Sequence, residues 1–242
     1  MTIDYLGSIR SDVDALLAVL ERGPLDTRVP SCPEWDLAQL AAHVGRVHGW
    51  ATTAVSTGSP PAGVPKSPDD PQAAKAFLAE NAEALLATLS TVEPNKPAWN
   101  FSGSGQTADW WIRRQAHEIA VHRWDAESAL GDPSPIAAEL AVDGVEEFLT
   151  VLAPLRLGGK DGIDIGGSIH LHASDAEGEW TLHTDDGIFR VTKGHSKGDV
   201  AVRGPASALV LLLWNRIGPR DAGLEVFGDP AVLDNWRSIT TI

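Results

Sequence analysis

The sequence predicts an α+β protein in which a four-helix bundle precedes a smaller domain of helices and strands. Two observations favour this fold class. Before residue 130 apolar side chains recur at helical spacing, whereas in residues 168–204 they alternate with polar ones in short runs. The segment LGDPSP, residues 130–135, contains the glycine and prolines typical of a boundary. We therefore expect domains at residues 1–133 and 134–242, the second with an antiparallel sheet.

Four helices are expected in the first domain. They cover about residues 4–22, 37–56, 71–90 and 110–129. The first ends near Gly23 and Pro24, and Asp36 stands three residues before Gln39 as a capping box for the second. Asp109 is in position to cap the fourth. Four helices of about 20 residues, joined by connections of differing length, favour a bundle.

The second domain is expected to contain short strands joined by glycine and aspartate turns. One more helix precedes them, over about residues 136–152. The expected strands cover residues 168–174, 179–185, 187–194 and 198–204. The run Asp185, Asp186 and Gly187 predicts a hairpin between the second and the third strand. Two helices, over about residues 205–214 and 230–237, complete this α+β domain.

Composition limits the class of function. The 242 residues have a formal net charge of −14 at pH 7, which argues against a nucleic-acid partner and against attraction to anionic lipid. The single cysteine, Cys32, excludes an internal disulfide. The acidic start is unlike a signal peptide, and the longest wholly apolar run, residues 208–214, is too short to span a membrane. We expect a cytoplasmic monomer or homodimer that acts on a small molecule.

The segment RRQAHEIAVHRWDAE, residues 113–127, places ionisable side chains on the fourth expected helix. His117 and His122 are five residues apart, about 140° around a helix, so this is not the H-E-x-x-H motif of zinc proteases. Glu118 and His122 are four apart and share a face. Two ligands are too few for a metal ion, so a third has to come from another segment.

The second expected helix offers His43 and His48 as the third ligand. His43 falls on the apolar stripe of the helix, whereas His48 falls nearer its edge, so His43 is the better inward-facing candidate. In a bundle it would join Glu118 and His122 in a set that suits zinc and leaves a fourth position open. The alternative is a solvated Glu118–His122 contact with His43 as a hydrogen-bonded core residue. Periodicity does not decide between them.

Two segments in the first half are distinctive in combination. VPSCPEWDLAQLAAHVGRVHGWA, residues 29–51, has a cysteine and prolines before a tryptophan, then a helical histidine, and WWIRRQAHEIAVHRWDAE, residues 110–127, contains E-x-x-x-H-x-x-D. They resemble the mycothiol-dependent maleylpyruvate isomerase family of actinobacteria. VRGPASALVLLLWNR, residues 202–216, and LEVFGDPAVLDNW, residues 224–236, look like the C-terminal half of that family. The resemblance covers nearly the whole chain. It implies a DinB-like bundle followed by a sterol-carrier-like domain.

The resemblance also implies a site and its chemistry. The metal ligands of the family fall on His43, Glu118 and His122, with Zn²⁺ as the ion and mycothiol, a low-molecular-weight thiol, as co-substrate. The arginine that binds a substrate carboxylate falls on Arg216, with Arg220 close by as the alternative. The implied reaction is thiolate attack on a small electrophilic substrate, either as an isomerase or as an S-transferase. The sequence does not distinguish these two.

Other residues have a structural interpretation beside the functional one. Asp125 could support a ligand histidine from behind, and we expect His117 to pack between helices. Cys32 is expected to be packed rather than nucleophilic, because no cation or histidine adjoins it in sequence. His170 and His172 alternate on an expected strand and share one face, which we expect to be exposed, with a second metal site as the alternative.

Two other functions remain open at this point. A metal-dependent hydrolase would use zinc-bound water in place of the thiol. A non-enzymatic protein would bind a small molecule in its C-terminal domain, with a structural metal or none.

Overall fold

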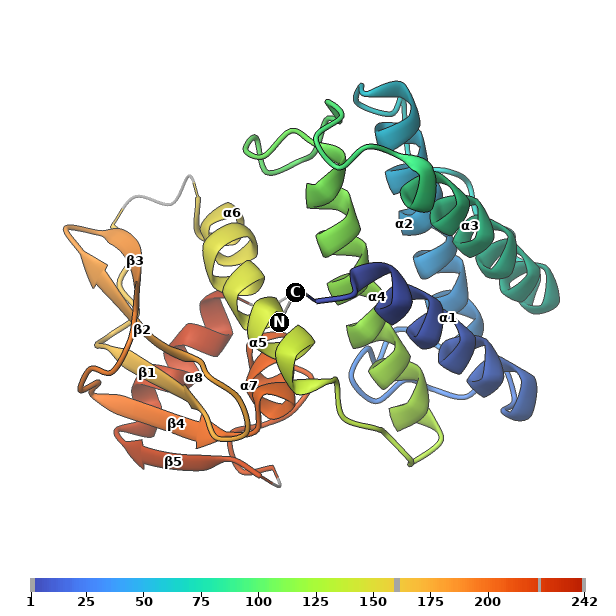
Figure 1. Ribbon diagram of the computed structural model, residues 1–242. Coiled ribbons are helices and arrows are strands. Elements are labelled where there is room, and N and C mark those ends of the chain that lie inside the picture. Colours follow the sequence, from blue (N-terminus) through green and yellow to red (C-terminus); the bar gives the residue numbers. More distant parts are fainter. Residues whose placement is uncertain (1–2, 159–161, 222, 241–242) are drawn as a thin grey trace. The chain divides into compact units, whose positions relative to one another are not determined.

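The computed structural model describes residues 3–158, 162–221 and 223–240. The chain divides into two compact units, residues 1–134 and 135–242. Figure 1 shows long helices in the first unit and a sheet with helices in the second. The α+β fold class predicted from the sequence is confirmed.

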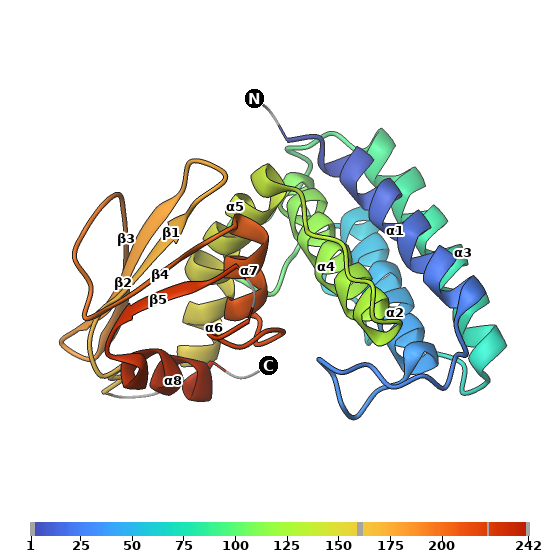
Figure 2. The same ribbon diagram turned by 90° about the horizontal axis from the view of Figure 1, so that it is seen from below.

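The first unit is built from four long helices. They are α1 (Tyr5–Arg22), α2 (Leu37–Thr57), α3 (Pro71–Thr91) and α4 (Ala108–Ala129). Helix α2 packs against α3 and α4, and α1 packs against α4 and α3, which makes the predicted bundle (Figure 2). The pattern of buried apolar residues follows the helical spacing seen in the sequence.

Short polar side chains begin three of these helices. Asp4 accepts a hydrogen bond from the Gly7 amide, Asp70 caps α3, and Asp36 forms both arms of the predicted capping box. The expected cap of α4 was wrong. Thr107 is its N-cap residue, without a side-chain capping bond, and Asp109 lies inside the first turn. The Asp109 carboxylate accepts from the Thr107 hydroxyl at 2.6 Å, which ties the cap residue to the helix.

Helices α2 and α3 approach closely because α2 has a glycine at their contact. A Cβ added at Gly45 would lie 2.7 Å from Phe77 Cδ1 and 3.1 Å from Leu78 Cα. Both distances are too short for carbon atoms, so only glycine fits without movement of α3. The close packing fixes the rotation of α2 about its own axis, and therefore the direction of its polar side chains.

The second unit consists of a sheet and several helices. Their bounds are α5 (Ala138–Glu147), a π-helical turn η1 (Phe148–Leu152), α6 (Ala153–Leu157), β1 (Ile169–Ala173), β2 (Glu179–Asp185), β3 (Ile188–Lys193), β4 (Val200–Gly204), α7 (Ala206–Leu213), β5 (Glu225–Gly228) and α8 (Pro230–Ile239). The helix predicted to end near residue 152 continues through η1 to Leu157. Pro154 lacks the amide that a regular α-helix needs there, which explains the π turn.

The strands of the described residues form a five-stranded sheet in the order β3-β2-β1-β4-β5. Its pairings are antiparallel as predicted, except that β1 and β4 are parallel. The connection from β3 to β4 crosses β2 and β1. As a result, β4 runs in the same direction as β1. The sequence prediction lacks β5, which has only four residues and largely exposed side chains. Within the described residues, no helix has both the length and the hydropathy needed to cross a membrane.

Candidate metal centre

Three side chains from α2 and α4 converge in the first unit. His43 Nε2 lies 3.4 Å from Glu118 Oε1, and His122 Nε2 lies 3.3 Å from the same oxygen. The ligand atoms of all three lie within 4.8 Å of one another. Two ligands about 2.1 Å from a tetrahedral ion are about 3.4 Å apart, whereas a hydrogen-bonded N–O pair is about 2.9 Å apart. The observed separations are those of long hydrogen bonds and also match ligands that share one ion.

The cluster is buried on the α4 side and open on the α2 side. The exposed fraction of the side chain is 6% for His122 and 13% for Glu118, but 25% for His43. The four-residue spacing on α4 brings the first two together, and α2 brings the third. A small molecule can therefore reach the cluster beside His43.

Asp125 fixes the orientation of His122. Its Oδ2 lies 2.9 Å from His122 Nδ1, and it is completely buried one turn along α4. Ser31 donates a hydrogen bond of 2.6 Å to the other carboxylate oxygen, and the Cys32 sulfur lies 3.9 Å from Oδ2. With Nδ1 engaged in this way, Nε2 is the ring nitrogen left to face Glu118. This arrangement is common behind the histidine ligands of metal ions.

The charges around Glu118 keep it ionised. Burial opposes its charge, but hydrogen bonds from His122 and His43 and the charge of Arg114 hold the pKa of Glu118 well below its usual value. Arg114 donates to Glu118 Oε2 at 2.8 Å and leaves Oε1 facing the histidines.

The same neighbours act on His122 in the opposite sense. Burial would lower its pKa, but hydrogen bonds to Asp125 and Glu118 raise the pKa of His122 to about 9. A metal ion that binds Nε2 therefore has to displace a proton at neutral pH.

Trp35 packs beside the histidines of the cluster. Its ring centroid lies 4.7 Å from that of His43 and 6.3 Å from that of His122. Backbone bonds from the Trp35 amide to the Cys32 carbonyl and from the Val29 amide to the Trp35 carbonyl make a tight turn that holds the ring there. The sequence alone predicts no role for Trp35, Arg114 or Ser31. The signals for two of them were an aromatic residue just before the helix of His43, and an arginine four residues before Glu118.

The relative burial of the two histidines on α2 was predicted wrongly. His48, expected near the edge, is completely buried, while His43 is partly exposed. Gly45, which lies on the same face of α2 as His48, allows α3 to pack closely there, so the expected edge is interior. Burial lowers the pKa of His48 to about 4, and it is therefore neutral at pH 7.

His117 lies apart from the cluster. It is 4% exposed, and its ring meets that of Tyr5 on α1 edge-on, with the centroids 6.2 Å apart. This agrees with the 100° offset from Glu118 that the sequence indicates.

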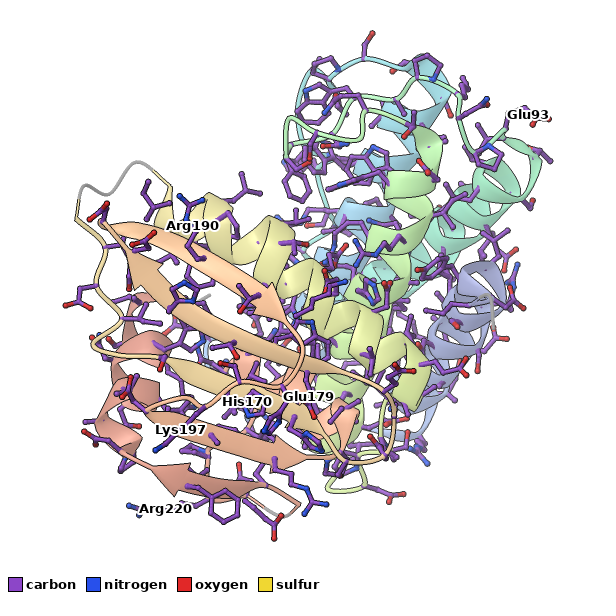
Figure 3. The ribbon with its side chains drawn as sticks, turned by 60° about the vertical axis from the view of Figure 1, so that its left-hand side comes forward. Glu93, His170, Glu179, Arg190, Lys197 and Arg220 are labelled. Atoms are coloured by element: carbon purple, nitrogen blue, oxygen red, sulfur yellow. The ribbon has the colours of Figure 1, made fainter. Side chains whose placement is uncertain are left out.

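Arg216 and Arg220 both follow α7 in the second unit. Arg216 is partly buried; its Nη1 donates to the Trp214 carbonyl at 3.0 Å, and its guanidinium carbon lies 5.7 Å from the Trp214 ring centroid. Burial lowers the pKa of Arg156 on α6, and the charge of Arg216 lowers it further. Arg220 is exposed at the surface of this unit (Figure 3). Arg216 is thus partly buried near Arg156, whereas Arg220 is exposed.

Fold and site together define a class: two-domain α+β proteins whose helical bundle presents two histidines and a glutamate in metal-ligand geometry. The family model of the mycothiol maleylpyruvate isomerase N-terminal domain matches residues 6–127, and that of the C-terminal domain of the same family matches residues 139–235. The chain therefore belongs to the mycothiol maleylpyruvate isomerase family, a family of enzymes.

Solved structures agree with this fold. The crystal structure of the mycothiol-dependent maleylpyruvate isomerase has a TM-score of 0.62 at 13% sequence identity, with 92% of this chain and 91% of that chain covered. A mutant of that isomerase with a histidine replaced by alanine has a TM-score of 0.63 at the same identity and coverage. No curated protein matches the sequence.

Proposed function

We propose that this protein is a zinc-dependent enzyme that uses mycothiol to isomerise a small electrophilic carboxylate, or to transfer the thiol to it. The observation that supports this most directly is the convergence of His43, Glu118 and His122 within 4.8 Å, on a cluster open to solvent on one side. Membership of the family supports mycothiol as the thiol and maleylpyruvate as the first substrate to test.

The donor set favours Zn²⁺. Two imidazole nitrogens and a carboxylate oxygen match the ligands of catalytic zinc sites, which keep a fourth position for an exchangeable ligand. When bound, such an ion lowers the pKa of a thiol in that position, as it lowers that of water.

The residues around the ligands prepare the site. Asp125 holds the His122 ring, and Arg114 holds Glu118 through Oε2, so that both ligands present one fixed atom each. Trp35 packs against His43 and shields part of its ring from water, which favours attack by the thiol over hydrolysis. In the isomerase reaction the thiol adds to a cis double bond, the adduct rotates about the resulting single bond, and elimination returns the trans product and the thiol. In the transferase reaction the adduct is released.

We assign the substrate carboxylate to Arg216 rather than to Arg220. Arg216 is partly buried and close enough to Arg156 to lower its pKa, and a partly buried guanidinium binds a carboxylate more strongly than an exposed one. Arg220 is exposed, where an ion pair would be weak. Loss of the carboxylate contact in Arg216→Gln should raise KM about 10- to 100-fold. Arg220→Gln is the matched control, and the opposite result would reverse the assignment.

Metal content and mycothiol binding, measured on the same samples, test the site. We expect wild type to contain zinc and bind mycothiol, and His122→Ala to lose both. His117→Ala is the matched control, since it removes a buried histidine from the same helix away from the cluster. The proposal fails if His122→Ala folds and retains zinc. Turnover without thiol would instead indicate a hydrolase, and a folded wild type without metal would indicate a binding protein.

A further inference from the structure

A second group of ligand-type side chains lies on the sheet of the second unit. His170 on β1, Glu179 on β2 and His195 in the β3–β4 connection have ligand atoms within 4.8 Å of one another. Figure 3 shows His170 and Glu179 next to each other on the sheet. Nothing in the proposed reaction uses these residues.

The topology of the sheet brings the three together. In the order β3-β2-β1-β4, residues 194–199 have to pass β2 and β1 between the end of β3 and the start of β4. The connection lies against β1, because a Cβ added at Gly198 would be 2.8 Å from the His170 amide nitrogen. The connection therefore covers His170, which is 5% exposed. Ile169 and Leu171 face the core, so His170 between them lies on the opposite face of the sheet, where exposure would otherwise be expected. The exposed face expected from the sequence is thus buried at His170.

The atoms of this cluster are spaced as ligands of one ion. His170 Nε2 lies 3.6 Å and His195 Nδ1 lies 3.2 Å from Glu179 Oε2, close to the separation of about 3.4 Å at a tetrahedral ion. His170 Nε2 and Glu179 Oε2 are both buried, and within the described residues neither makes a hydrogen bond of good geometry. Buried polar atoms without partners are rare, and an ion between them would satisfy both.

His172 holds the carboxylate in place. It pairs directly with Glu179 across the two strands, and its Nδ1 lies 2.6 Å from Glu179 Oε1. Oε2 is therefore the oxygen left for the other two histidines. Arg203, opposite His172 on β4, is paired with Glu225 at 2.9 Å, which reduces the repulsion that its charge would exert on a cation.

We propose that His170 Nε2, Glu179 Oε2 and His195 Nδ1 bind a divalent transition-metal ion such as Zn²⁺, which attaches residues 194–199 to the sheet. The His195 side chain is 83% exposed, so the ion exchanges with solvent. This site differs from the one in the bundle in every ligand and lies wholly in the second unit.

Zinc stoichiometry of the metal-free full-length protein, measured by equilibrium dialysis and elemental analysis, tests the proposal. We expect two ions in wild type, one in His122→Ala, one in His195→Ala and none in the double variant. His195 is exposed, so its replacement leaves the core unchanged. His183→Ala is the control, because it removes a histidine from the same face of β2 and should retain two. The proposal is wrong if the double variant binds as much zinc as His122→Ala. If the bundle does not bind zinc but the sheet does, His122→Ala binds one ion, as wild type does, and His195→Ala binds none.

Proteolysis provides a second measurement. Lys197 is exposed within the connection, and we expect trypsin to cleave after it when the connection opens (Figure 3). In the His122→Ala background, zinc at 100 times its Kd should slow this cleavage about 100-fold, since it binds only the closed form. The double variant should show no effect. Cleavage at an unchanged rate in His122→Ala would show that no ion attaches the connection.

Discussion

Asp125 contacts His122 at Nδ1 and is not among the three proposed ligands. Its replacement therefore tests the effect of orienting a ligand without removing one. Asp125→Asn keeps the shape of the side chain but loses the negative charge that bonds Nδ1. We expect zinc affinity to fall about 10- to 100-fold with the fold intact, as for other residues behind histidine ligands. A competition titration against a chelator measures this. Ser31→Ala, which removes only the bond to the other carboxylate oxygen, should cost less, and an equal loss would contradict the positioning role.

His48 makes the stability of the metal-free protein depend on pH. Its pKa is about 4 in the folded protein and 6.5 when the side chain is exposed in the unfolded chain, so between these values the unfolded chain binds more protons. Stability from this group is therefore present above pH 6.5 and is lost as the pH falls towards 4. From about pH 7 to about pH 4.5 the loss is about 2 kcal/mol.

Replacement of His48 by an apolar residue tests that dependence. His48→Met should remove about 2 kcal/mol of the acid-induced loss, measured by urea unfolding of the metal-free protein at both pH values. Ionisable groups that do not interact with His48 contribute equally to both proteins, so the difference between the proteins is the informative quantity. An identical pH dependence would show that His48 does not titrate as its burial implies.

How far the site could be predicted differs among its residues. Glu118 and His122 share a helix, and four-residue spacing alone places them on one face. His43 faces them only because α2 packs against α4 at a particular rotation. That rotation depends on Gly45 and the residues of α3 that contact it, which explains why periodicity misjudged the burial of His43 and His48. The role of these residues as metal ligands stays a prediction.

At the scale of elements, the contact between α2 and α3 depends on the absence of a side chain at Gly45. Alanine favours a helix by about 1 kcal/mol over glycine, but its Cβ would clash with Phe77 and with the backbone of Leu78. We expect Gly45→Ala to lower the free energy of unfolding by about 1 kcal/mol, and Gly45→Val by about 3 kcal/mol. Urea unfolding measures both. Gly63→Ala is the control, since an added Cβ there meets no atom within 4 Å; an increase in stability for Gly45→Ala would refute the close packing.

The elements themselves were predicted to different extents. Long amphipathic helices with aspartate caps, such as α1 and α2, are recognisable because their bonds and caps are local. The parallel pairing of β1 with β4 was not predicted, since strand order depends on contacts between distant segments. The strand β5 has four residues, too few for its alternation to be distinguished from a loop.

At the scale of the whole molecule, net charge governs which partners approach. With a formal charge of −14, the protein should be repelled by nucleic acid. We expect no binding to a labelled DNA duplex by fluorescence anisotropy at about 50 mM salt, where phosphate contacts are strongest. Binding that weakens as salt is raised to about 200 mM would contradict this expectation.

Local information was enough to define the fold class, the helices of the bundle and the Glu118–His122 pair, because each depends on residues within a few positions of one another. The approach of His43 to that pair, the burial of His48 and the passage of His195 over His170 appear only in the folded chain. Each of these requires two segments that are distant in sequence to pack against each other in one relative position. That position depends on how the shapes of the two packed surfaces fit together, which the hydrophobic pattern of either segment does not specify.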